Sequence, residues 1–64
     1  MYVNGRQIAM TDGMSVMDLL KKEGYDAQRV AVEKNGKIVP KGSFGTEKLS
    51  GGDRIEIVSF VGGG

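Results

Sequence analysis

The sequence predicts an α+β domain in which one short amphipathic helix packs on a mixed sheet of four to five strands. Three observations lead to this fold class. Two Asn-Gly pairs each lie between short apolar segments, which is the strongest short-range signal of a β-hairpin. The segment between them carries apolar residues at helical spacing. The last segment, RIEIVSFV, alternates and is rich in β-prone residues.

The first hairpin is expected in MYVNGRQIAM, with strands over residues 1–3 and 6–10. Asn4-Gly5 favours a type I′ turn because both central residues of that turn need positive φ. Successive side chains of a strand point to opposite faces, so Met1, Val3 and Ile8 are expected to face the core.

A helix is expected over Val16–Glu23, with its start and end both marked. Ser15 followed by Asp18 approximates a capping box, and the helix dipole also favours an acidic side chain at this end of the helix. The apolar stripe consists of Val16, Leu19 and Leu20. Gly24 is expected to end the helix in a Schellman motif, with Tyr25 covering Leu20.

A second hairpin is expected in RVAVEKNGKIVP, around Asn35-Gly36. Val30 and Val32 form the alternating apolar side of its first strand, and Pro40 ends the second. Residues 41–49 are expected to be a loop with Phe44 and Leu49 turned inward. The segment SGGD then forms another turn.

The last strand is expected to span residues 54–61 and to lie at the centre of the sheet, because it is the longest β-prone segment. Alternation divides it into two faces. The inner set is Ile55, Ile57, Ser59 and Val61, and the outer set is Arg54, Glu56, Val58 and Phe60. The order strand, strand, helix, strand, strand, strand is that of the β-grasp, or ubiquitin-like, arrangement. The domain is therefore expected to cover residues 1–61, followed by a flexible glycine tail over residues 62–64.

Composition excludes several classes of function. The chain has 64 residues, no cysteine, no histidine and a formal net charge of +1. Disulfides and the usual zinc or iron–sulfur ligand sets are absent, so no metal site is expected. Scattered charges and dispersed aromatics argue against nucleic-acid binding. No apolar run is long enough for a membrane span and no signal peptide is recognised, so a cytoplasmic protein is expected.

The acidic residues do not form a catalytic constellation. Asp12, Asp18, Asp26 and Asp53 are interpreted as turn and cap residues, which is where aspartate is favoured. The segment GKIVPKGSFG lacks the glycine and lysine spacing of a phosphate-binding loop.

Two features point to function instead. Val58 and Phe60 share the outer face of the last strand next to the tail, and clustered exposed apolar residues usually mark a binding surface. The alternative is that the strand bends or bulges and buries Phe60. The tail Gly62-Gly63-Gly64 is either a frayed end or cloning remnant, or a chain slim enough to enter a narrow channel. It would bring the α-carboxylate of Gly64 into that channel, where ATP can convert a carboxylate into a reactive acyl-adenylate.

The segments VNG, AVEKNGKIVP and GDRIEIVSFVGGG resemble the ThiS family of sulfur carriers in thiamine (thiazole) biosynthesis, within the ubiquitin-like superfamily. The resemblance implies that a ThiF-type adenylating enzyme activates Gly64 with ATP and magnesium. A sulfur donor, a cysteine-derived persulfide, then converts the adenylate to a thiocarboxylate.

The same resemblance implies that thiazole synthase, ThiG, receives this sulfur. The chain would then be a co-substrate rather than an enzyme, with no cofactor of its own, and Val58, Phe60, Val61, Gly62 and Gly63 would contact the partners. Three alternatives stay open: the small subunit of molybdopterin synthase, a ubiquitin-like protein modifier, and a non-catalytic binding module.

Overall fold

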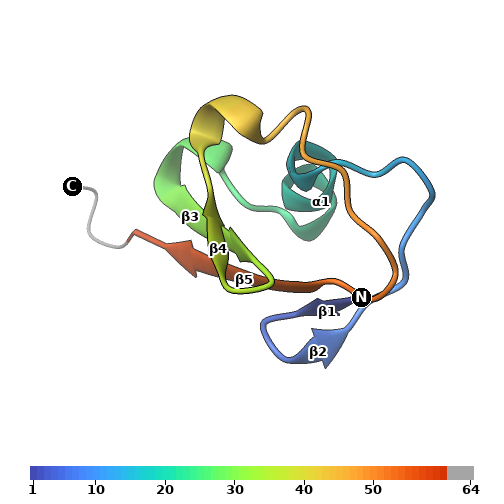
Figure 1. Cartoon of the computed structure of the whole chain (residues 1–64). Coiled ribbons are helices and arrows are strands. Elements are labelled where there is room, and N and C mark those ends of the chain that lie inside the picture. The colour runs from blue at the N-terminus through green and yellow to red at the C-terminus, as the bar shows by residue number, and fades with distance from the viewer. Residues whose placement is uncertain (61–64) are drawn as a thin grey trace.

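The computed structural model describes residues 1–60 as one five-stranded sheet with a helix on one of its faces (Figure 1). The strands are β1 (Tyr2–Val3), β2 (Arg6–Gln7), β3 (Val30–Lys34), β4 (Lys37–Val39) and β5 (Arg54–Ser59). The helix is α1 (Val16–Glu23), and two 3₁₀ turns complete the fold, η1 (Ala27–Arg29) and η2 (Lys41–Ser43).

The sheet has the order β2-β1-β5-β3-β4, so β5 is central, as the sequence predicted. β1 and β5 run parallel, and the other neighbouring strands run antiparallel. One face packs on α1 and the other faces solvent. The α+β class and the β-grasp arrangement are confirmed.

Both Asn-Gly pairs form the predicted turns. Asn4 and Asn35 have φ values of 51° and 53°, and the glycines after them have φ values of 81° and 84°. The predicted strand over residues 6–10 was too long, because β2 ends at Gln7. The chain leaves the sheet there, and Ile8 and Met10 pack, partly buried, against the core instead of continuing the exposed edge.

The helix has the predicted bounds and both predicted caps. The Ser15 hydroxyl accepts from the Asp18 N–H, and the Asp18 carboxylate accepts from the Ser15 N–H. At the other end Gly24 has a φ of 81°, and the Tyr25 N–H donates to the Leu20 carbonyl at 2.9 Å. These bonds form a Schellman motif, and Tyr25 is partly buried against the core.

The segment from Lys41 to Leu49, expected to be a plain loop, does more than connect. Phe44 and Leu49 are buried in the core, as predicted. The Val16 and Met17 N–H groups donate to carbonyls of this segment, on Glu47 at 2.9 Å and on Phe44 at 2.8 Å. The first N–H groups of a helix have no partner within it, so the loop satisfies donors that would otherwise be left free.

The core lies between α1, the inner face of the sheet and this loop. Its members are Met1, Val3, Met14, Val16, Leu19, Leu20, Val30, Val32, Val39, Phe44, Leu49, Ile55 and Ile57. Met1 and Val3 face it as predicted, while Ile8 lies at its margin.

Two asparagine side chains hold the central strand. The Asn4 amide accepts from the Ile57 N–H at 2.8 Å and donates to the Ile57 carbonyl at 3.2 Å. The Asn35 side chain accepts from the Arg54 N–H at 3.0 Å. Each turn residue therefore serves twice: it adopts positive φ for its hairpin and its amide binds the β5 backbone.

Candidate functional site

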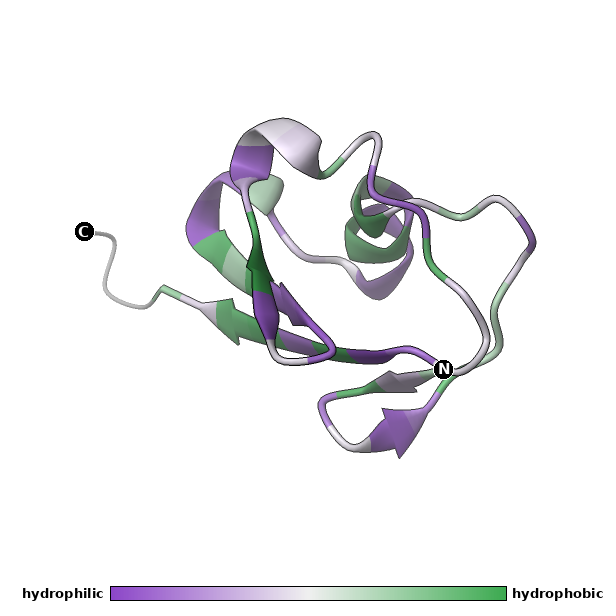
Figure 2. Cartoon of the chain, viewed as in Figure 1, coloured by the Kyte–Doolittle hydropathy of each residue, from purple (hydrophilic) through white to green (hydrophobic). Residues whose placement is uncertain are grey.

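The candidate site is the C-terminal end of β5, where the outer face of the sheet carries apolar side chains. Val58 is 60% exposed and Phe60 is 56% exposed, while Ile55 and Ile57 on the other face are buried. In Figure 2, hydrophilic and hydrophobic bands alternate along the first half of β5, and its C-terminal end is mainly hydrophobic. The predicted placement of Val58 and Phe60 is confirmed, and the alternative in which Phe60 is buried is wrong.

Phe60 is held in place by the two 3₁₀ turns. Its N–H donates to the Arg29 carbonyl at the end of η1, at 2.8 Å. Lys41, the first residue of η2, places its ammonium 5.7 Å from the centroid of the Phe60 ring. The same ammonium donates to the Gln28 carbonyl at 2.7 Å. The backbone of Phe60 is therefore bonded to η1, and its ring contacts η2.

The surroundings of this patch, defined as Val58, Phe60 and Lys41, are mixed in character. Ala31 of β3 lies opposite Val58 in the register and is partly buried. The next pair on the same face of the sheet is Glu33 with Glu56, and Ile38 of β4, 74% exposed, lies opposite Glu33. On β5 the exposed apolar side chains therefore lie at its C-terminal end, beside these carboxylates, and Ile38 is a separate exposed apolar side chain on β4.

Ser59 was placed on the same side of β5 as Ile55 and Ile57 by alternation, and unlike them it is exposed. It lies opposite Val30, the first residue of β3, which belongs to the hydrophobic core. Alternation predicts the direction of a side chain, whereas burial also needs a neighbouring layer to cover it.

Four residues of the predicted site, Val61, Gly62, Gly63 and Gly64, lie outside the described residues. The predicted boundary between a domain ending at residue 61 and a flexible tail lies there as well. Lys41 and Arg29 were not singled out in the sequence. No sequence signal pointed to them, because their link to Phe60 depends on how η1, η2 and β5 meet in space.

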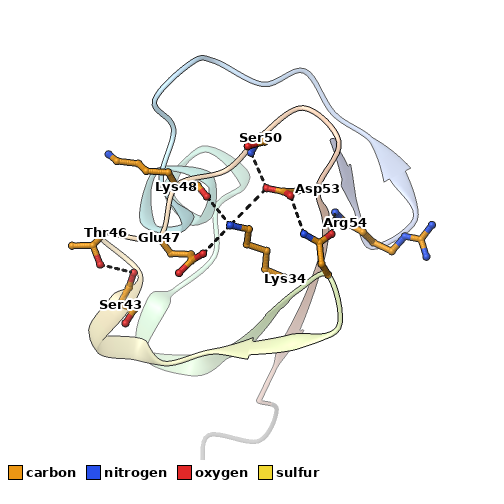
Figure 3. Close-up of polar contacts among 9 residues, drawn as sticks. Lys34, Ser43, Thr46, Glu47, Lys48, Ser50, Asp53 and Arg54 are labelled. Carbon is orange, nitrogen blue, oxygen red and sulfur yellow. Dashed lines mark hydrogen bonds and ion pairs between the residues drawn. The ribbon is translucent and has the colours of Figure 1, made fainter.

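Two of the residues with shifted pKa values, Lys34 and Asp53, lie away from the patch. They belong to a polar cluster between the β3–β4 hairpin and the loop before β5 (Figure 3). The Lys34 ammonium binds the Glu47 carboxylate at 2.8 Å and the Lys48 carbonyl at 2.9 Å, and lies 4.0 Å from the Asp53 carboxylate. The bond to Glu47 raises the pKa of Lys34, partly opposed by desolvation. The cluster fastens the loop to β3.

Asp53 is the buried anion of this cluster. It accepts from the Asn35 amide at 2.9 Å and from the Ser50 N–H at 2.7 Å. Burial raises its pKa, but these two hydrogen bonds and the Lys34 charge outweigh burial, so the pKa lies below its usual value. Asp53 is a turn residue, as predicted, and also joins the turn to the β3–β4 hairpin.

The other aspartates agree with their interpretation as turn and cap residues. Asp26 caps η1 by accepting from the Gln28 N–H, and Asp12 lies in the turn that the Met14-to-Thr11 backbone bond closes. The Ser15 N–H bond and then the Ser15 hydroxyl lower the pKa of Asp18. Asp26 also lies 3.7 Å from the guanidinium of Arg29, the residue whose carbonyl accepts from the Phe60 N–H.

The concave parts of the surface do not coincide with the patch. A shallow depression of about 470 Å³ is lined by Asn35, Gly36, Gly52, Arg54 and Glu56, at the opposite end of β5. Across residues 1–60, no group of three or more acidic, cysteine or histidine side chains is arranged to hold a metal ion. The patch therefore offers exposed apolar contact area, and none of its three residues lines this depression.

No helix in the described part of the chain has the length and apolar character needed to cross a membrane.

Comparison with known proteins assigns the chain to a family. The model of the ThiS family matches residues 1–64. The chain is 35% identical over 65 residues to the sulfur carrier protein ThiS of Bacillus subtilis, an alignment that covers 100% of this chain and 98% of that protein. It is 42% identical over 64 residues to a thiazole synthase of Paramagnetospirillum magneticum and 36% identical over 63 residues to one of Magnetococcus marinus. The chain covers only 20% and 19% of these two proteins.

A solved structure agrees with the sequence matches. The crystal structure of a thiamine biosynthesis protein (ThiS) from Geobacter metallireducens superposes with a TM-score of 0.79 at 30% sequence identity. That likeness covers 98% of this chain and 96% of the other. Fold, family model and relatives of equal length all agree, and the chain belongs to the ThiS family.

Proposed function

We propose that this chain is a sulfur carrier for synthesis of the thiazole ring of thiamine. The observation that carries the proposal is the match of the ThiS family model to residues 1–64, which includes the three terminal glycines. The full-length likeness to the sulfur carrier protein of Bacillus subtilis supports it.

The reactive group in this proposal is the α-carboxylate of Gly64. A carboxylate is a poor electrophile, but its attack on the α-phosphate of ATP releases pyrophosphate and gives an acyl-adenylate. The outer sulfur of a cysteine persulfide then attacks the acyl carbon and displaces AMP, which gives an acyl disulfide on Gly64. A thiol attacks the donor's sulfur of this disulfide, forms a new disulfide with it, and releases Gly64 as a thiocarboxylate. The ATP and magnesium sites belong to a ThiF-type adenylating enzyme, which must position the two anions and neutralise the phosphate charge.

The chain's own contribution is recognition and delivery. Val58 and Phe60 form the contact surface for the partner, and the residues from Val61 to Gly64 form a thread that enters its active site. A glycine thread fits a channel that would exclude side chains. The attachment of Phe60 to Arg29 and Lys41 fixes the point at which this thread leaves the domain.

Thiazole synthase is the proposed acceptor of the sulfur. Two relatives named thiazole synthase contain a segment similar to this whole chain, so a carrier-like domain and the synthase occur on one polypeptide there. A carrier that must deliver its cargo to one enzyme gains effective concentration from such a link.

The test is to incubate the protein with a ThiF-type enzyme, ATP, magnesium, a persulfide donor and a thiol reductant, and to follow ATP–pyrophosphate exchange and the intact mass. The expected product is heavier by the difference between one sulfur and one oxygen atom. A variant that lacks Gly64 should fold normally and acquire no such mass. If it acquires the mass and still supports thiazole formation, or if the sulfur goes only to a molybdopterin synthase large subunit, the proposal is wrong.

A further inference from the structure

The central strand β5 is paired very unequally along its two edges. On one edge, all residues from Ile55 to Ser59 lie opposite residues of β3. On the other edge, only Arg54 and Ile55 lie opposite residues of β1. Figure 1 shows β1 and β2 beside the first part of β5 only, while the rest of β5 continues toward the tail with no strand on that side.

The hydrogen-bond pattern shows which backbone groups face the open edge. The Phe60 N–H donates to the Arg29 carbonyl, and the Asn35 N–H donates to the Arg54 carbonyl at 2.8 Å, so the alternate residues Arg54, Glu56, Val58 and Phe60 direct their backbone groups to β3. Antiparallel pairs alternate in this respect. Ile55, Ile57 and Ser59 therefore direct their N–H and C=O groups away from β3.

The turn at Asn4 forms hydrogen bonds with the backbone of the first two of these three residues, Ile55 and Ile57. The Asn4 N–H donates to the Ile55 carbonyl at 2.9 Å, and the Asn4 side chain binds both backbone groups of Ile57. At Gly5 the chain turns back into β2, so the β1 side ends there. Within residues 1–60, no hydrogen bond from that side reaches the N–H or C=O of the exposed Ser59.

An open strand edge of this kind is a template for another strand. Proteins usually protect such edges with charged side chains, proline, bulges or a covering loop. Here the residues that flank Ser59 are the exposed and apolar Val58 and Phe60. The open edge and the apolar patch are therefore adjacent parts of one surface.

We propose that thiazole synthase docks by adding an extended segment to β5 at Ser59, with apolar side chains of that segment covering Val58 and Phe60. This rests on the proposed function, and it names the synthase because relatives carry both domains on one chain. In strand addition the main-chain bonds give affinity and the neighbouring side chains give specificity.

Backbone pairing would also fix the position of the carrier along its partner, which apolar contacts alone do not fix. Main-chain bonds come at fixed steps along the strand, so they set the register of the carrier relative to its partner. Gly64 is five residues beyond Ser59, and five extended residues span about 17 Å. Pairing at Ser59 thus sets how far the carboxyl end reaches beyond the docking surface.

The first test uses the unaltered protein. Amide hydrogen exchange at Ser59 is measured by NMR in the free carrier and in its complex with thiazole synthase. Exchange should be fast in the free protein and at least ~10-fold slower in the complex, since paired strand amides are protected. An unchanged rate in the complex overturns the proposal. So does slow exchange that appears at high carrier concentration without the synthase, because a second copy then occupies the edge.

The second test compares two substitutions at the same position. Ser59→Pro removes the N–H that faces the open edge and leaves the bonds to β3 in place, a position where proline is tolerated. Ser59→Ala keeps the N–H and removes only the hydroxyl. Calorimetric binding to the synthase should weaken ~10-fold for Ser59→Pro, the scale of one hydrogen bond, and stay within about 2-fold of the wild type for Ser59→Ala. Equal affinities of the two variants overturn the proposal.

These results are separable from the sulfur-carrier proposal. If Ser59 is protected by the synthase but Gly64 never gains sulfur, the docking mode stands and the carrier function fails. If Gly64 gains sulfur while Ser59 is protected only by the adenylating enzyme, the carrier function stands and the assignment of the edge to thiazole synthase is wrong.

Discussion

Replacing Phe60 by aspartate should separate docking from folding. Complete burial of a phenylalanine side chain contributes about 1.5–3 kcal/mol. Phe60 is still 56% exposed in the free domain, so roughly 1–1.5 kcal/mol of that remains available to a partner. Loss of this contact alone raises Kd about 5- to 10-fold, and a carboxylate desolvated at the interface should bring the total to about 100-fold or more.

The cost to the fold should be much smaller. The part of the Phe60 ring already covered, together with its contact to the Lys41 ammonium, contributes about 1–2 kcal/mol. A domain of 64 residues typically has about 3–10 kcal/mol of stability, so the variant should remain folded. The new carboxylate also lies near Lys41, which offsets part of the loss.

The assay is isothermal titration of the carrier into the ThiF-type enzyme and into thiazole synthase, with urea unfolding of the same samples. Gln7→Glu is the matched control: it adds the same charge at an exposed position of β2, the far edge of the sheet. It should bind like the wild type. If Phe60→Asp unfolds the domain, or if it is folded and binds as tightly as the control, Val58 and Phe60 are not the docking surface.

Two further variants test the polar cluster around Asp53 and the contact between Lys41 and Phe60. Asp53→Ala leaves Asn35 and Ser50 without their shared acceptor and should lower the stability at pH 7 by about 2–4 kcal/mol in urea unfolding. Because the pKa of Asp53 is depressed in the folded state, this difference should be complete above about pH 4 and shrink as the pH falls through the folded-state pKa; a difference that stays constant as the pH falls contradicts the assignment. Lys41→Met should raise the KM for the carrier in ATP–pyrophosphate exchange with little change in kcat, and Lys41→Arg should restore it; equal KM values for all three proteins would exclude a role for Lys41 in orienting Phe60.

Local signals in the sequence determined most of the elements. Ser15 and Asp18 specify the start of α1, and each cap is made by residues within a few positions of it. Asn35-Gly36 specifies a hairpin because positive φ is a property of those two residues and needs no distant partner. Alternation along β5 placed Val58 and Phe60 outside for the same reason.

The family likeness and the terminal glycines were also readable in the sequence, because a family signature is written in residue order. They directed attention to Gly64 and the end of β5. What they did not indicate was how the end of β5 is secured or which of its edges is open. Residues 41–49 matched no recognisable motif and were expected to be only a loop, although they close the core and satisfy the start of α1.

Only the tertiary structure decided the contacts between segments far apart in the chain. Asn4 binds Ile57 across 53 residues, and Lys41 meets the Phe60 ring. Such contacts depend on how the sheet, the helix and the 3₁₀ turns pack together, and no periodicity or cap motif encodes them. The sequence by itself determined which segments form strands, turns and helix, since those preferences are local. The packing of β1, β3 and β5 side by side creates the side-chain bonds that anchor β5. The same packing leaves the backbone edge at Ser59 open.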